Sequence, residues 1–140
     1  MKIEEIKKVV QTINSSNIYE LLKENNLNVV YSDILNKRKL DATLFENIIL
    51  IKSNLTPEYE QFILYHELGH FLLHFQSEER YSFYLSKYKN RIENEANIFS
   101  FLCLTRDMDL TNTNIIELSV QLGIPSKIAL QIYEYMLLSL

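Results

Sequence analysis

All three histidines of the chain, His66, His70 and His74, lie within nine positions, in the segment FILYHELGHFLLHF. Upstream, Thr56-Pro57-Glu58 has the features of a helix start, because threonine caps helix N-termini, proline is favoured at the first helical position and acids suit the positive end. We therefore predict one helix from about 57 to 75. Its apolar neighbours indicate that it is buried, so the fold has to accommodate imidazoles beside its core.

The spacing of HELGH is typical of a metal centre. Side chains four residues apart on a helix point the same way, so the imidazoles of His66 and His70 can both bind one zinc ion at about 2.0–2.1 Å. Glu67 lies about 100° around the helix, where its carboxylate can take a proton from a metal-bound water. The alternative is an amphipathic helix with two half-exposed histidines. Glycine in mid-helix costs about 1 kcal/mol relative to alanine, so Gly69 indicates a structural requirement at this position. Such a requirement favours the metal site.

A third ligand is expected from the segment RIENEANIFS, residues 91–100, on a further predicted helix from about 90 to 105. Glu93 and Asn97 are four apart, so Glu93 can complete a His₂Glu site while Asn97 hydrogen-bonds a ligand. Glu95 is the rival ligand. His74 lies a further turn along its helix, too far to share the ion with His66, and is expected to make a core hydrogen bond or one to a ligand. The structural alternative is that Asn90 and Glu93 form only a capping box.

The remaining segments predict an α+β fold. Residues 3–13 match an amphipathic helix and 17–20 a capping box that opens a second helix. Residues 28–34 and 42–53 are β-branched and aromatic, with a turn at 46–47, and predict a short antiparallel sheet of about three strands. We expect NIILI (47–51) to be an edge strand to which an extended substrate adds.

We expect a single domain over 1–140, consisting of a helical N-terminus (1–27), the sheet and active-site helices (28–105) and a helical C-terminal subregion (112–140). In that last subregion a capping box at 114–117 and a Leu122-Gly123 stop precede a final helix through Leu138.

Charge and cysteine content exclude several classes of protein. A net charge of −4 argues against direct nucleic-acid binding, which needs a clustered basic surface. Cys103 is the single cysteine, so no internal disulfide forms. No apolar stretch is long enough to span a membrane. We expect a cytoplasmic protein, monomeric by default.

Taken together, YHELGHFLLH (65–74), IENEANIFS (92–100) and NIILIKSNL before the long helix resemble the ImmA/IrrE-type metallopeptidases. The resemblance covers about Ile18 to Leu104. It departs from the family at Ser100, where the family often has alanine, and at Thr105, where a proline often closes the segment.

The resemblance implies a small zincin-like domain with an incomplete sheet and helices on one side. It implies zinc bound by His66, His70 and Glu93, with Glu67 as the catalytic residue. It also implies a substrate class, helix-turn-helix transcriptional repressors. Tyr81, Tyr84 and Tyr88 are candidate donors to the oxyanion of such a reaction.

The leading hypothesis is thus a zinc-dependent endopeptidase that hydrolyses a peptide bond in a repressor. The alternative is a metal-stabilised antirepressor that binds its partner without cleavage. A third hypothesis is a helical interaction module whose histidines bind nothing.

Overall fold

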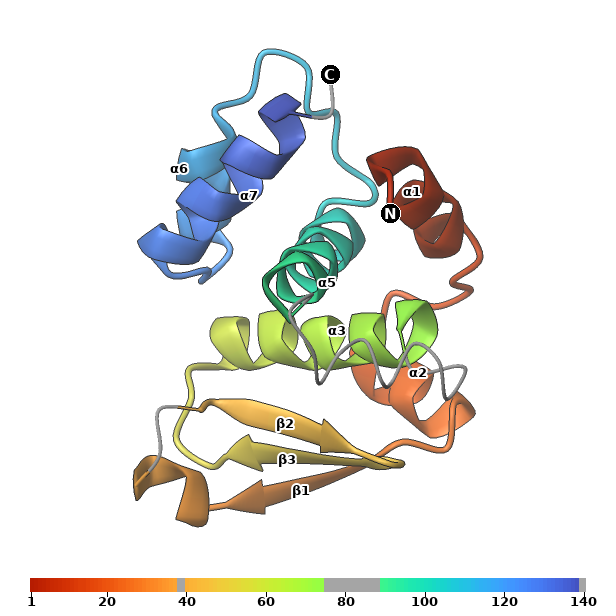
Figure 1. Ribbon diagram of the computed structural model, residues 1–140, viewed down its shortest axis with the longest axis vertical. Helices are drawn as coiled ribbons and strands as arrows, with labels where there is room; N and C mark the ends of the chain where they lie inside the picture. The colour runs from red at the N-terminus through yellow and green to blue at the C-terminus, as the bar shows by residue number, and fades with distance from the viewer. Residues whose placement is uncertain (38–39, 75–88, 139–140) are drawn as a thin grey trace.

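The computed structural model describes residues 1–37, 40–74 and 89–138. It confirms an α+β fold in which a long helix lies between a three-stranded sheet and a layer of further helices (Figure 1). The elements are α1 (Ile3–Gln11), α2 (Ile18–Glu24), β1 (Asn28–Ser32), the 3₁₀ helix η1 (Ile34–Lys37), β2 (Ala42–Phe45), β3 (Ile48–Lys52), α3 (Pro57–Leu73), α5 (Lys89–Leu104), α6 (Ile115–Gln121) and α7 (Ser126–Leu138).

Helix starts lie where the capping residues predicted them. The side chains of Asn17, Thr56 and Asn114 each accept a backbone N–H from the first turn of α2, α3 and α6, respectively. These bonds satisfy donors that the helix itself leaves unpaired. Between α6 and α7 the chain turns at Gly123, whose φ of 89° is a conformation that glycine adopts without strain.

The sheet is mixed, which corrects the expectation of an antiparallel sheet. Its strand order is β1-β3-β2, with β3 antiparallel to β2 but parallel to β1. The connection through η1 leaves room for one strand between β1 and β2. The tight turn at 46–47 then brings β3 into that position. The most apolar strand thereby takes the central position, where Ile49 and Ile51 are fully buried.

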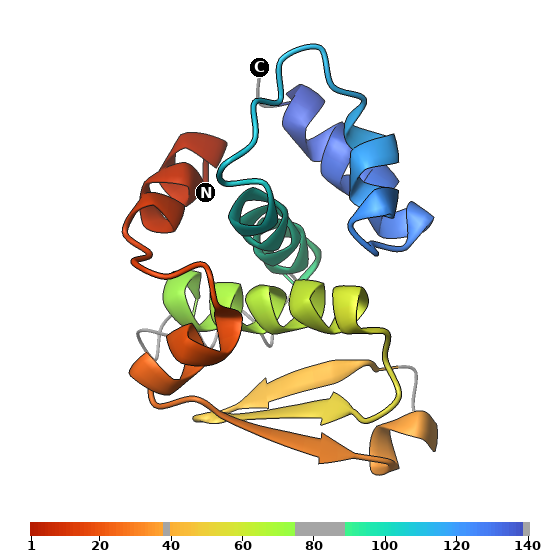
Figure 2. The ribbon, with the colours of Figure 1, turned by 180° about the vertical axis from the view of Figure 1, so that it is seen from behind.

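The expectation that residues 47–51 form an edge strand is therefore wrong, because β3 is paired on both sides. The strand nearest α3 in both views is β2, whose outer edge carries no other strand of the described chain (Figures 1 and 2). The N–H of Lys52 donates to the carbonyl of Asp41 at 2.9 Å. Since bonded and non-bonded pairs alternate along an antiparallel ladder, Ala42 and Leu44 direct their backbone groups to the open edge.

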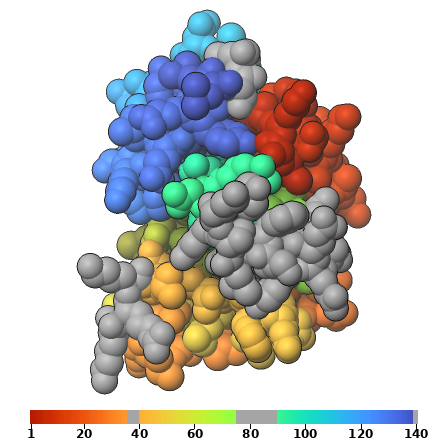
Figure 3. Space-filling view, viewed as in Figure 1, coloured from red at the N-terminus to blue at the C-terminus, as the bar shows by residue number. Residues whose placement is uncertain are grey.

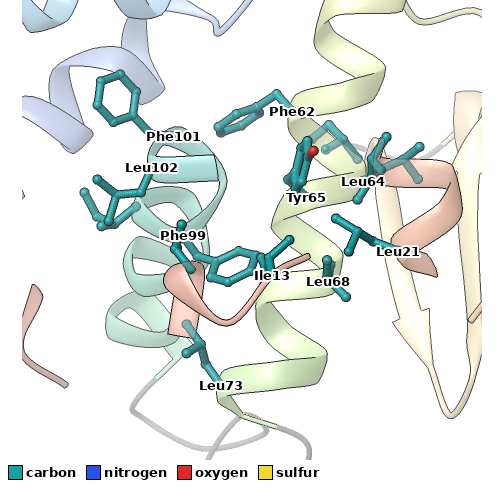
Figure 4. Close-up of a cluster of buried hydrophobic side chains, with 14 of the residues drawn as sticks. Ile13, Leu21, Phe62, Leu64, Tyr65, Leu68, Leu73, Phe99, Phe101 and Leu102 are labelled. Carbon is teal, nitrogen blue, oxygen red and sulfur yellow. The ribbon is translucent and has the colours of Figure 1, made fainter. Parts of the chain in front are cut away.

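The core is centred on the pair α3 and α5. Phe62, Leu64 and Leu68 of α3 are fully buried, as are Phe99 and Phe101 of α5 (Figure 4). One side of α5 packs against α3. Its other side lies between α1 and the C-terminal helices (Figures 1 and 3). Among the described residues, no helix combines the length and apolar character needed to cross a membrane.

Gly69 has a packing role that explains its place in mid-helix. A Cβ atom at this position would lie 2.8 Å from Cδ1 and 3.2 Å from Cβ of Phe99, which is fully buried on α5. Such distances are well inside van der Waals contact. The missing side chain therefore allows α5 to approach α3 closely, one residue from His70.

We predict that Gly69→Ala destabilises the protein. Alanine gains about 1 kcal/mol of helix propensity, but overpacking against Phe99 costs roughly 1–3 kcal/mol. The expected net result is a loss of up to about 2 kcal/mol of unfolding free energy, measured by urea denaturation.

The matched control is the same substitution in a Phe99→Leu background. A smaller side chain on α5 leaves room for the new methyl group, so Gly69→Ala should cost less there. If Gly69→Ala alone is at least as stable as the parent protein, the contact between the helices does not require glycine.

Candidate metal centre

Three side chains selected from the sequence converge on one point. The Nε2 atoms of His66 and His70 lie 3.1 Å apart. Glu93 faces both of them, with Oε2 at 3.1 Å from Nε2 of His66 and Oε1 at 3.0 Å from Nε2 of His70. One donor atom from each residue lies within 4.8 Å of the others. The close approach of α3 and α5 thus brings together residues that are 23 or more positions apart in sequence.

The donor set fits a divalent cation such as zinc. In a tetrahedral site with bonds of about 2.0–2.1 Å, neighbouring donors are separated by roughly 3.3 Å. The separation of 3.1 Å between the two imidazole nitrogens is close to that value, and Glu93 presents one carboxylate oxygen to each of them. Two imidazole nitrogens and one carboxylate also form the ligand set of catalytic zinc sites that keep a fourth position for water.

Asn97 orients the first histidine, as its spacing from Glu93 predicted. Its Oδ1 lies 2.8 Å from Nδ1 of His66. An amide oxygen only accepts, so Nδ1 of His66 carries the hydrogen and Nε2 presents a lone pair to the cluster. This is the tautomer that a metal ligand requires.

The two alternative ligand candidates, His74 and Glu95, pair with each other outside the cluster. His74 lies with Nδ1 at 3.0 Å from Nδ1 of His70 and Nε2 at 2.9 Å from Oε1 of Glu95. The other carboxylate oxygen of Glu95 lies 2.6 Å from the α-amino group of Met1. The sequence suggested a hydrogen bond for His74 but not its partner Glu95.

Glu67 is buried beside the cluster, at 5% exposure. Burial, the largest effect, raises the pKa of its carboxyl to about 7; the charge of His66 opposes this shift and that of Glu93 adds to it. The charges of two candidate ligands, His66 and Glu93, therefore act on this carboxylate. A carboxyl with a pKa near neutrality is suited to accept and release a proton.

The pKa values of the candidate ligands depend on burial and on one another. Burial lowers the pKa of His70 to about 4, which favours the neutral imidazole that metals bind. Burial would raise the pKa of Glu93, but its interactions with the imidazoles of His66 and His70 outweigh burial and keep that pKa well below its usual range. For His66, burial acts to lower the pKa, but the contact with Glu93 and the charges of Glu67 and Glu93 outweigh it and raise the pKa.

A polar groove adjoins the cluster between α5 and α7. It has a volume of about 440 Å³, and Glu93 and Asn97 form part of its wall. Residues from α7 that line it include Gln131, Glu134 and Tyr135. The candidate oxyanion donors Tyr81, Tyr84 and Tyr88 lie outside the described residues.

Comparison with known proteins places the candidate centre inside a segment that matches a protein family. A family model described as an IrrE N-terminal-like domain matches residues 22–125, which include all the candidate site residues. The uncharacterized immunity region protein 2 of Bacillus phage phi105 is 30% identical over 138 residues, 89% of this chain and 84% of that protein. Metallopeptidase ImmA of Bacillus subtilis strain 168 is 30% identical over 108 residues, 74% of this chain. The chain spans 63% of the length of ImmA, less than two-thirds.

We predict that the purified protein, stripped with a chelator and then dialysed against zinc, retains about one zinc per chain. His70→Ala and Glu93→Ala should each lose it, because two remaining ligands hold zinc weakly. Elemental analysis after gel filtration measures the ratio.

Glu60→Ala is the matched control, since Glu60 is a carboxylate on the same helix that accepts hydrogen bonds from Tyr19 and Tyr31 instead. It should keep its zinc. Full zinc retention by Glu93→Ala would remove Glu93 from the ligand set.

Proposed function

The chain belongs to the family of IrrE N-terminal-like domains, ImmA/IrrE-like metallopeptidases, and from this premise we propose that it is a zinc-dependent endopeptidase. The observation that carries the proposal is the convergence of His66, His70 and Glu93 on one point with Glu67 buried beside them. A site built only to stabilise the fold would not need an additional buried carboxylate, because burying a charge is costly.

His66, His70 and Glu93 would hold the ion. A bound zinc ion supplies Lewis acidity, which polarises a carbonyl and lowers the pKa of water toward about 7. Glu67 accepts the proton of the attacking water and delivers it to the leaving amine. Asn97 keeps His66 in the tautomer that the site needs.

The proposed substrate is a helix-turn-helix transcriptional repressor. Two arguments support this class: the family resemblance of the motifs, and a relative named for an immunity region of a phage. The chain would recognise the repressor as a protein partner, since its net charge of −4 does not favour nucleic acid.

Substrate binding is proposed at the open edge of β2. An extended segment of the repressor would add to this edge as a further strand, which provides main-chain hydrogen bonds without requiring one sequence. The edge lies on the side of the sheet nearest α3, the helix that carries His66 and His70. A helical repressor segment would have to become extended before it is cut.

We predict that Glu67→Gln abolishes cleavage but keeps zinc. The amide preserves the size of the side chain and leaves the three ligands intact, yet it cannot accept the proton of water. The test co-expresses a repressor with either form, follows its cleavage on denaturing gels, and measures reporter transcription and zinc content.

Parent protein and Glu67→Gln should differ in both cleavage and derepression. If the variant still relieves repression while the repressor stays whole, the protein acts as an antirepressor by binding. If the parent relieves repression without any cleavage product, the endopeptidase proposal fails.

We predict that Ala42→Pro impairs cleavage by removing a donor from the open edge. Proline is tolerated at the first residue of a strand, and the N–H of Ala42 points away from β3, so the ladder stays intact. KM for a repressor-derived peptide should rise by about tenfold, the cost of a lost hydrogen bond of about 1.4 kcal/mol.

Ala42→Gly is the control, because it also changes the side chain but keeps the N–H. It should cleave with nearly the parental KM. Equal KM values for the proline and glycine variants would place the substrate elsewhere.

A further inference from the structure

A buried hydrogen-bonded chain extends from the candidate metal centre to α5. Nδ1 of His70 lies 3.0 Å from Nδ1 of His74, and Nε2 of His74 lies 2.9 Å from Oε1 of Glu95. His74 and Glu95 are 5% and 1% exposed, respectively. The chain therefore runs through the protein interior, where water does not compete for these hydrogen bonds.

The chemistry of the partners assigns the direction of the hydrogens. An ionised carboxylate only accepts, so Nε2 of His74 donates to Glu95. In neutral His74 the other nitrogen, Nδ1, is then an acceptor, and Nδ1 of His70 has to donate to it. The lone pair of His70 is thus left on Nε2, the atom that faces His66 and Glu93.

Stability alone does not explain these two residues. A buried His–Glu pair contributes little net stability, because desolvation offsets the attraction, and apolar replacements are often as stable. The second oxygen of Glu95 is balanced by the α-amino group at 2.6 Å and, more distantly, by Nε of Arg91 at 3.8 Å. The first oxygen of Glu95, Oε1, is the acceptor at the far end of the hydrogen-bonded chain.

We propose that His74 and Glu95 are positioning residues that hold His70 in the tautomer and orientation needed for metal binding. The inference rests on the proposed metal centre and adds to it two residues outside the ligand set. Both ligand histidines then have their Nδ1 atoms fixed, His66 through Asn97 and His70 through His74. Partners of this kind typically contribute 10–100-fold to metal affinity.

The test measures zinc affinity of the metal-free protein by competition with a chromophoric chelator, without reference to catalysis. His74→Phe should weaken zinc binding by about 10–100-fold, because Nδ1 of His70 loses its acceptor. His74→Gln offers an amide oxygen as a replacement acceptor and should recover part of the loss. Glu95→Gln, which is nearly isosteric, should weaken binding by about tenfold. The double variant His74→Phe/Glu95→Gln should match His74→Phe, because Glu95 acts through His74.

Ser100→Ala is the matched control, since Ser100 is also a fully buried polar residue of α5 that contacts α3, through Oγ donating to the carbonyl of Phe62 at 2.7 Å. It should lower unfolding stability but leave zinc affinity unchanged. The absorption spectrum of the cobalt-substituted protein adds a readout of ligand geometry, which should change in His74→Phe and stay parental in Ser100→Ala.

The outcomes separate this inference from the proposed function. A parent protein that binds no zinc contradicts the metal centre itself. A parent that binds zinc while folded His74→Phe binds it within twofold of the same affinity overturns the positioning role alone. If His74→Phe does not fold, Glu95→Leu decides, because leucine offers no acceptor to His74, and an unchanged affinity in that variant overturns the inference.

Discussion

The close contact between α3 and α5 is the interaction on which the rest of the structure depends. Gly69 allows the ring of Phe99 to lie where a Cβ atom would otherwise be. This contact sets the separation of the two helices. Glu93 can face His66 and His70 only because that separation is small.

The same helix pair supplies both the candidate ligands and the groups that orient them. From α5, Asn97 reaches His66, while Glu95 reaches His70 through His74. A change that separates the helices would therefore disturb ligand geometry and tautomers together. This coupling links core packing to the chemistry, so mutations distant from the candidate site can affect it through helix spacing.

Local signals made much of this arrangement predictable. The capping residues Asn17, Thr56 and Asn114 placed three helix starts, since capping is decided within a few residues. The four-residue spacing of His66 and His70, and of Glu93 and Asn97, predicted which side chains share a helix face, and the structure brings these two faces together. The assignment of all 140 residues to one domain stays a prediction.

Long-range features could not be predicted from the sequence. The order of the strands depends on how the connection through η1 crosses the sheet, which alternation of apolar residues does not encode. The pairing of His74 with Glu95 joins positions 21 apart, and helical periodicity gives no information about which neighbouring helix a side chain meets. A clue was present, because His74 continues the four-residue spacing beyond His70 and an acid follows Glu93 by two positions.

Anomalous diffraction from crystals grown with zinc, recorded on both sides of the zinc absorption edge, tests the central claim most directly. The account predicts one strong peak about 2 Å from Nε2 of His66, Nε2 of His70 and a carboxylate oxygen of Glu93. A peak bound instead by His74 and Glu95, or no peak near α3 at saturating zinc, would contradict it.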